Sequence, residues 1–169
     1  MKTFCSTTII AALLLVILIG CTPQQSDQLT QQQKEQIKKE IKAVCDSIIE
    51  RLQKMDVDGA LKYYSPDFVC FGSDGEQSDF QGYKKYCAET YNSATAYKWT
   101  TYNQDFIVIN KDIVVISWDG KNELLMKSGD TIKFDPSHYT WALKKIAGQW
   151  KVAYHHFSGN FVTQKADLK

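Results

Sequence analysis

The chain has 169 residues, with 20 basic and 19 acidic side chains and a formal net charge of +1 at pH 7. A nearly neutral chain without a run of lysine or arginine lacks the charge of a phosphate-backbone binder, so we expect no nucleic-acid partner. The length is enough for one domain with a single hydrophobic core.

The first twenty residues read as a targeting segment. Lys2 supplies the positive start, and the unbroken apolar run from Ile9 to Ile19 is too short to cross a bilayer, where about 20 residues are needed. The following Leu18-Ile19-Gly20-Cys21 resembles a bacterial lipobox, in which the cysteine sulfur receives the lipid. We predict a lipoprotein signal peptide over residues 1–20 and acyl chains, such as palmitate, that anchor Cys21 in a membrane. An ordinary secretory signal is the alternative.

This leader places the protein in a bacterial cell envelope. Thr22, rather than aspartate, after the lipidated cysteine favours the outer membrane if the organism has one. Residues 21–33 are polar and rich in glutamine, which predicts a flexible tether. The folded domain is then expected over residues 34–162, with a C-terminal tail over residues 163–169.

Two helices are predicted after the tether. Apolar residues recur at spacings of four and three and form one stripe of a helix of about six turns: Ile37, Ile41, Val44, Ile48, Leu52 and Met55. Asp56 or Asp58 can cap a shorter second helix, which continues to Tyr64 and must end at Ser65-Pro66.

A short strand pair and a third helix follow. The strand covers residues 68–71, the chain turns at residues 72–75, and residues 76–80 return. In the next helix one face carries Tyr83, Tyr86, Cys87, Thr90 and Tyr91. Beyond it the pattern is all strand, over residues 96–109, 113–126, 131–145 and 149–162. Helices followed by meandering strands predict an α+β domain in which a curved antiparallel sheet wraps the helices.

The last two strands form a hairpin whose register depends on its loop. A three-residue loop at Ile146-Ala147-Gly148, which we favour, pairs Lys145 with Gln149. One face then carries Tyr139, Trp141, Leu143, Ala153, His155 and Phe157, and the other carries Trp150, Val152, Tyr154 and His156. A two-residue loop would exchange these partners.

Large apolar side chains on both faces of this hairpin imply that both faces are covered. We expect helices or a cavity on the first face. On the second face we expect the sheet of an identical subunit, so that a homodimer forms through Trp150, Val152, Tyr154 and His156.

Four segments, taken in order, carry a resemblance to a known family. They are Asp56 to Val69, F-G-S-D-G at 71–75, Q-G-Y-K-K-Y at 81–86, and the run from Trp141 to Gly159. Together they resemble the nuclear transport factor 2-like superfamily, and within it the SnoaL-like domains. The final strand is also similar to that of the association domain of calcium/calmodulin-dependent protein kinase II. The resemblance implies a cone-shaped α+β barrel, or cystatin-like roll, with a deep pocket and frequent dimers through the outer sheet face.

The resemblance does not choose an activity, because isomerases, dehydratases and plain binding domains share this fold. In the kinase association domain, arginines point into the pocket from two strand positions. The matching positions here are Trp141 and Phe157, so the arginines are absent and a pocket that binds carboxylates through arginine is not supported. We expect an aromatic pocket lined by Tyr139, Trp141, His155, Phe157 and Trp99, which suits a ring-bearing or acyl ligand. Alternatively, the aromatic residues simply fill the core.

His155 is the one titratable group expected on the pocket face, and Asp119 aligns roughly with another pocket position of the family. The two residues are candidates for a catalytic pair in which His155 acts as general base and the Asp119 carboxylate fixes the tautomer of its imidazole. The alternative, which the residues favour, is a packed histidine with hydrogen-bonded nitrogens and a simple turn at Asp119-Gly120.

Neither a metal ion nor a cofactor is expected. His155 and His156 are adjacent in a strand and point to opposite faces, so they cannot join His138 around one ion. The resemblance gives His156 a structural or interface role.

Three cysteines remain in the domain, and each is expected as a buried thiol that packs as a small apolar side chain: Cys45, Cys70 and Cys87. One disulfide among these three cysteines is possible in an oxidising compartment, and the sequence does not decide whether it forms. A cysteine nucleophile would need a nearby base, and only His155 is a candidate.

We therefore predict a lipid-anchored envelope protein that binds a small, mainly apolar or aromatic ligand, and we favour a binder over an enzyme. One alternative is an isomerase or hydrolyase that uses His155 or Asp119 as general base. The other is a structural dimerisation domain whose cavity is filled by its own side chains.

Overall fold

The computed structural model describes residues 28–166, so the predicted signal peptide, Cys21, most of the tether and residues 167–169 lie outside the described part. Its helices are α2 (Gln31–Gln53), α3 (Val57–Leu61) and α4 (Phe80–Asn92). Its strands are β1 (Tyr64–Phe71), β2 (Gln77–Asp79), β3 (Ala94–Asn110), β4 (Ile113–Met126), β5 (Thr131–Ile146) and β6 (Gln149–Gln164). The four long strands predicted from the pattern are all present; β4 has the predicted bounds, and the other three are longer by one to three residues.

Helix α2 begins inside the segment that was assigned to the tether. The Thr30 hydroxyl accepts a hydrogen bond from the backbone N–H of Gln33 at 3.2 Å, and the Gln33 side chain accepts one from the Thr30 N–H at 2.8 Å. This capping box satisfies two N–H groups of the first turn. Helix α2 therefore starts at Gln31, with Thr30 as its N-cap, rather than at Lys34, although its first three residues are all glutamine.

The apolar stripe of α2 faces the sheet. Ile37, Ile41, Cys45 and Ile48 are its buried residues, at spacings of four, four and three. That spacing keeps them on one side of a helix with 3.6 residues per turn. Met55, which was expected to end the stripe, lies beyond the last helical residue and takes a positive φ of 60°.

Helix α3 is shorter, and β1 longer, than the pattern predicted. Asp56 is the N-cap, with its carboxylate accepting from the Gly59 N–H at 2.9 Å, and the helix ends at Leu61. Strand β1 begins at Tyr64 and contains Pro66. The pairing of β1 with β6 shifts register between Tyr64 and Val69, so Pro66 lies at an irregularity, where a missing N–H costs no ladder bond.

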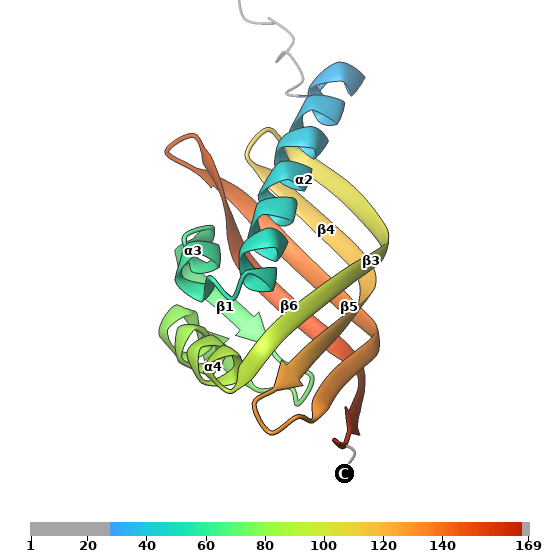
Figure 1. Ribbon diagram of the computed structural model, residues 1–169. Coiled ribbons are helices and arrows are strands. Elements are labelled where there is room, and N and C mark those ends of the chain that lie inside the picture. The colour runs from blue at the N-terminus through green and yellow to red at the C-terminus, as the bar shows by residue number, and fades with distance from the viewer. Residues whose placement is uncertain (1–27, 167–169) are drawn as a thin grey trace, which may run out of the picture.

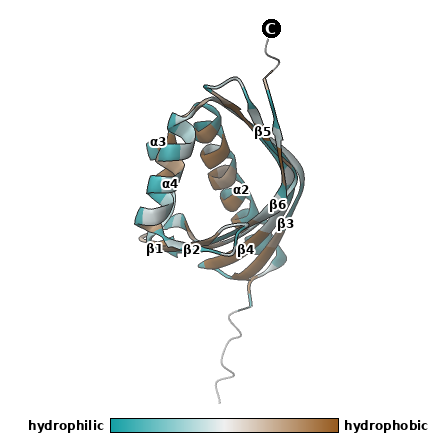
Figure 2. Cartoon of the chain, turned by 90° about the horizontal axis from the view of Figure 1, so that it is seen from below, coloured by the Kyte–Doolittle hydropathy of each residue, from teal (hydrophilic) through white to brown (hydrophobic). Residues whose placement is uncertain are grey.

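The six strands of the described residues form one sheet in the order β2-β1-β6-β5-β4-β3. The sheet curves around α2, and α3 and α4 lie on the same concave side (Figures 1 and 2). The α+β class and the cone shape are confirmed. The sheet is mixed rather than wholly antiparallel, because β6, the last strand of the meander, lies beside β1 and runs parallel to it.

The hairpin between β5 and β6 has a two-residue loop, so the predicted three-residue loop is wrong. Ile146 pairs with Gln149, and Ala147 and Gly148 have φ values of 48° and 79°. Two successive positive φ angles are those of a type I′ turn, whose twist matches that of the flanking strands.

Beyond this turn a β-bulge returns some side chains of β6 to the sheet face on which they were predicted. Leu143 pairs with Val152 but Ala142 pairs with Tyr154, so Ala153 is an extra residue in β6. An extra residue reverses which side chains face inward beyond it. Trp141 and His155 consequently share the concave face as expected, whereas Trp150 and Val152 share it too, against expectation.

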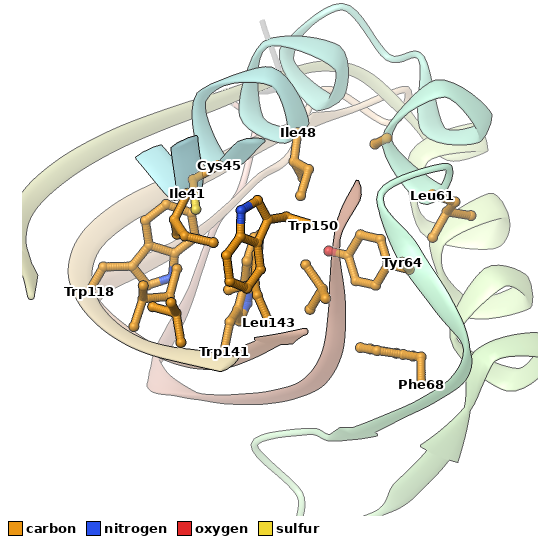
Figure 3. Packing of buried hydrophobic residues seen from close by; sticks show 14 of the residues in the cluster. Ile41, Cys45, Ile48, Leu61, Tyr64, Phe68, Trp118, Trp141, Leu143 and Trp150 are labelled. Carbon is orange, nitrogen blue, oxygen red and sulfur yellow. The ribbon is translucent and has the colours of Figure 1, made fainter. Parts of the chain in front are cut away.

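The core lies between α2 and the concave face of the sheet. Figure 3 shows Ile41, Cys45 and Ile48 of α2 directed at Trp118, Leu143 and Trp150, with Tyr64 and Phe68 of β1 closing the far side. Side chains with 0% or 1% exposure form its centre: Ile41, Cys45, Ile48, Phe68, Val114, Ile116, Leu143 and Val152. The helix thus fills one half of the cone.

Candidate functional site

The other half of the cone contains a cavity of about 280 Å³. It lies between α4, the turn that joins β1 to β2, and the concave face of β3 to β6. Its walls are mainly aromatic: Tyr64, Tyr83, Tyr86, Tyr91, Tyr97, Trp99, Trp118, Phe134, Tyr139, Trp141 and Phe157. All five residues predicted for the pocket line this cavity, namely Tyr139, Trp141, His155, Phe157 and Trp99.

His155 is the central polar group of the cavity. Its side chain is enclosed by aromatic rings, with centroids 5.4 Å from Tyr139, 5.6 Å from Tyr83 and 5.6 Å from Trp141. The residue is 4% exposed, and neither ring nitrogen has a hydrogen-bond partner among the described residues. Burial, helped by the nearby His156, lowers the pKa of His155 to about 3, so the imidazole is neutral at pH 7.

Two indole N–H groups beside His155 are also unsatisfied. The Nε1 atoms of Trp118 and Trp141 are buried without a partner in the described part of the chain. Their rings meet edge to face at 4.7 Å. Buried polar groups are normally paired, so the cavity presents several hydrogen-bonding atoms without partners among the described residues.

Asn122 is a cavity residue that the sequence analysis missed. It is 3% exposed, and its amide donates a hydrogen bond of 2.8 Å to the Tyr139 hydroxyl. Its position was readable in principle, because Trp118, Gly120, Asn122 and Leu124 alternate along β4 and all four are buried. Gly120 is needed there, since a Cβ would lie 2.8 Å from the Trp99 ring and 2.5 Å from a backbone oxygen.

The cavity tyrosines are protonated at neutral pH. Burial raises the pKa of Tyr64, Tyr83, Tyr91, Tyr97 and Tyr139 well above the usual value. Their hydroxyls can therefore donate as well as accept hydrogen bonds, and they add no negative charge to the cavity.

All three cysteines of the described part are buried and unpaired, as their patterns predicted. Cys45 belongs to the core under α2, whereas Cys70 and Cys87 line the cavity. Burial raises the pKa of Cys70 to about 11 and that of Cys87 to about 12. Neither thiol is a ready nucleophile, because the reactive form is the thiolate.

Asp119 is not near His155 in the way the base hypothesis requires. It lies on the convex face of β4, where its carboxylate is 2.6 Å from Nδ1 of His138, its partner on β5. Both side chains are about half exposed. Since adjacent strand residues point to opposite faces, the inward position of Trp118 turns Asp119 outward. The proposed His155–Asp119 pair is therefore wrong.

Two of the four residues assigned to a dimer interface lie in the core. Val152 is 0% exposed and Trp150 is 6% exposed. The Trp150 indole donates a hydrogen bond of 2.9 Å to Glu40 of α2, which lowers the pKa of that carboxyl, and Lys145 lies 5.0 Å from the Trp150 ring centre. The shorter hairpin loop is the reason. Only Tyr154 and His156 remain on the convex face.

Within residues 28–166 no group of three or more histidine, cysteine or acidic side chains is arranged to hold a metal ion. None of the helices in this range has the length and apolar character needed to cross a bilayer.

The fold and site define a curved α+β roll with one aromatic cavity between the sheet and its covering helices. The family model of the SnoaL-like domain matches residues 41–163, and the chain belongs to this family. No curated protein matches the chain.

Solved structures of the same fold are numerous, and three illustrate its range. A protein from Novosphingobium aromaticivorans provisionally assigned as a scytalone dehydratase has a TM-score of 0.72 at 10% identity, over 83% of this chain and 94% of that one. The hexachlorocyclohexane dehydrochlorinase LinA-type3 from Novosphingobium barchaimii gives 0.68 at 12% identity, over 80% and 94%. A calcium/calmodulin-dependent protein kinase II association domain, provisionally assigned in Xanthomonas campestris, gives 0.63 at 20% identity, over 72% and 86%. At these identities the likeness concerns the fold alone.

Proposed function

We propose that the domain binds a small, mainly apolar or aromatic molecule in its cavity and performs no chemistry on it. The observation that carries this proposal is His155, a buried imidazole with two unpartnered nitrogens inside an aromatic cavity. An unpaired buried polar group costs about 1–3 kcal/mol, which a ligand with one hydrogen-bonding group would recover. The cavity volume of about 280 Å³ lies just below the usual range of about 300–1,000 Å³ for small-molecule sites, so the ligand should be small.

The same site lacks the features of a base catalyst. A histidine with a pKa of about 3 has little tendency to take up a proton at pH 7, and Asp119 is engaged with His138 on the opposite face. The two cavity thiols are protonated as well. Two structural neighbours are described as a dehydratase and a dehydrochlorinase, and these activities are not transferred to this chain.

Native mass spectrometry of the purified domain tests the proposal. We expect a copurifying molecule that is retained by His155→Gln, which keeps hydrogen bonding, and lost in His155→Leu, which does not. Tyr154→Ala, one residue away on the convex face, is the matched control and should leave the bound mass unchanged. An empty wild-type domain that also fails to take up small aromatic molecules would contradict the proposal and favour a self-filled cavity. Turnover of a bound molecule by wild type but not by His155→Gln would favour the enzyme.

For the anchor, we propose lipidation at Cys21 and attachment to a bacterial envelope membrane, supported by the sequence Leu18-Ile19-Gly20-Cys21. Metabolic labelling with a fatty-acid analogue should mark the wild-type protein and leave Cys21→Ser unlabelled. Label retained in the variant would contradict the anchor.

For the assembly, we propose a homodimer through the convex face around Tyr154 and His156, the two predicted interface residues that remain available there. Tyr154→Glu should give monomers by light scattering, because a buried unpaired charge is costly at an interface. A wild-type protein that is monomeric at micromolar concentration would contradict the proposed homodimer.

A further inference from the structure

The charged residues around the cavity are all acidic. Two carboxylates line its mouth, Asp74 and Glu76, both exposed on the turn between β1 and β2. No lysine or arginine belongs to the lining within the described residues. Neither carboxylate takes part in an ion pair in that part of the chain, although many other surface carboxylates do. Their charge is therefore not neutralised locally.

The negative charge of Asp74 reaches the interior of the cavity. Burial is the main cause that raises the pKa values of Cys70 and Tyr86, and the Asp74 carboxylate raises both further. Cys70 is the direct partner of His155 in the pairing of β1 with β6. The negative charge of the mouth thus acts on two side chains of the cavity lining, Cys70 and Tyr86.

The cavity walls favour the same sign of ligand charge. The Tyr139 ring meets Trp99 edge to face at 5.0 Å and Trp118 at 6.1 Å, so faces of the three rings point in different directions. The faces of tryptophan and tyrosine rings carry negative electrostatic potential and attract cations, most strongly where water is excluded. An aromatic cavity under an acidic mouth is a site for positive charge.

We propose that the ligand is an organic cation, a protonated amine or quaternary ammonium group on a small apolar body. This inference rests on the proposed function, because it names the class of molecule that the cavity takes. A protonated amine would donate an N–H to the free acceptor nitrogen of His155 and lie against the ring faces, while its body fills the apolar space. Carboxylate and phosphate ligands are disfavoured, since the lining of the described part supplies no positive group.

Three probes with one body and different charges test the proposal: 2-phenylethylammonium, 2-phenylethanol and phenylacetate at pH 7. Titration of the whole folded domain, followed by calorimetry or tryptophan fluorescence, should give the order cation, neutral, anion. We expect the cation to bind on the order of ten-fold more tightly than the alcohol, with a difference that shrinks as salt is added.

A pair of substitutions that removes both negative charges of the mouth while nearly keeping side-chain shape, Asp74→Asn with Glu76→Gln, isolates the electrostatic part. Asparagine keeps the oxygen that accepts the Glu76 N–H at 3.0 Å, so the turn should persist. The variant should bind the cation several-fold more weakly and the alcohol unchanged. Its matched control is Glu35→Gln with Asp46→Asn, which removes the same charge from exposed positions of α2 and should alter neither affinity.

The outcomes separate this inference from the proposed function. If the alcohol or phenylacetate binds as tightly as the cation, the inference is overturned while the binding function stands. If the mouth variant and its control lower cation affinity equally, the inference is also overturned, because net charge alone would explain it. If none of the probes binds at millimolar concentration and the domain carries no copurifying molecule, both ideas fail.

Discussion

The two halves of the cone are built from different side chains. In one half, Ile41 and Ile48 of α2 pack against Leu143 and Val152 on the concave face of the sheet, and all four are at 0% exposure. Beside α4 the same face carries rings and a cavity of about 280 Å³. One sheet therefore provides a filled half and a hollow half.

The difference follows from the helix that covers each half. Helix α2 offers branched aliphatic side chains, such as Ile41 and Ile48, that pack against those of the sheet. Helix α4 offers Tyr83, Tyr86 and Tyr91, which meet other rings at their edges and stand as rigid walls. The aliphatic side chains of α2 pack with the core, in which Trp118, Trp150 and Phe68 also take part, whereas the rings of α4 line the cavity.

The largest expected effect concerns pH and the hollow half. Because the pKa of His155 is lowered from 6.5 to about 3 in the folded protein, the unfolded chain binds the extra proton between these values. Stability is therefore full above pH 6.5 and falls as pH drops toward 3. At about 1.4 kcal/mol per pH unit the loss approaches roughly 5 kcal/mol. Urea unfolding of wild type and of His155→Gln between pH 7 and pH 3 measures it. Equal losses in the two proteins would contradict the low pKa.

The next effect compares core truncations in the two halves. Leu143→Ala in the filled half should cost about 2–5 kcal/mol, because the site cannot collapse around the missing atoms. Leu124→Ala, on a cavity wall at 7% exposure, should cost at least about 1 kcal/mol less, since space already exists beside it. Chemical denaturation gives both values. Similar losses would mean that the halves are packed alike.

A smaller effect of opposite sign is expected from His155→Leu. Removing a buried imidazole without partners should stabilise the ligand-free domain by about 1–3 kcal/mol while abolishing ligand binding. His156→Leu, exposed on the other face, is the control; at protein concentrations low enough for a monomer it should stay within about 0.5 kcal/mol of wild type. A destabilised His155→Leu domain would show that the imidazole has a partner in the empty protein.

The smallest effect concerns the hairpin turn that decides which residues enter the filled half. Ala147 has a φ of 48°, which costs an alanine more than an asparagine. Ala147→Asn should therefore raise the thermal midpoint, with a gain of about 0.5–1 kcal/mol, whereas Gly148→Ala should lower it. If Ala147→Asn were destabilising, the two-residue turn would be in doubt.

Much of the fold was readable from the pattern. Apolar residues at helical spacing located α2, and alternation located β3 to β6 to within a few residues, because each pattern reports which side of one element is buried. Trp141, His155 and Phe157 were placed on one face from a wrong loop length, and they share that face because the bulge at Ala153 compensates for it. Asn122 was missed, since a lone polar residue in an alternating strand looks like an exposed position.

The sequence by itself determined the element order, the α+β class and the aromatic character of the concave face, all of which follow from local spacing and residue type. The register and the pairing of the strands were decided only by the tertiary structure. The parallel contact of β1 with β6, the two-residue turn and the bulge at Ala153 depend on strands meeting across the sheet. One residue of register moves every side chain to the other face. That shift put Trp150 and Val152 in the core, and the inward position of Trp118 left Asp119 beside His138 on the convex face.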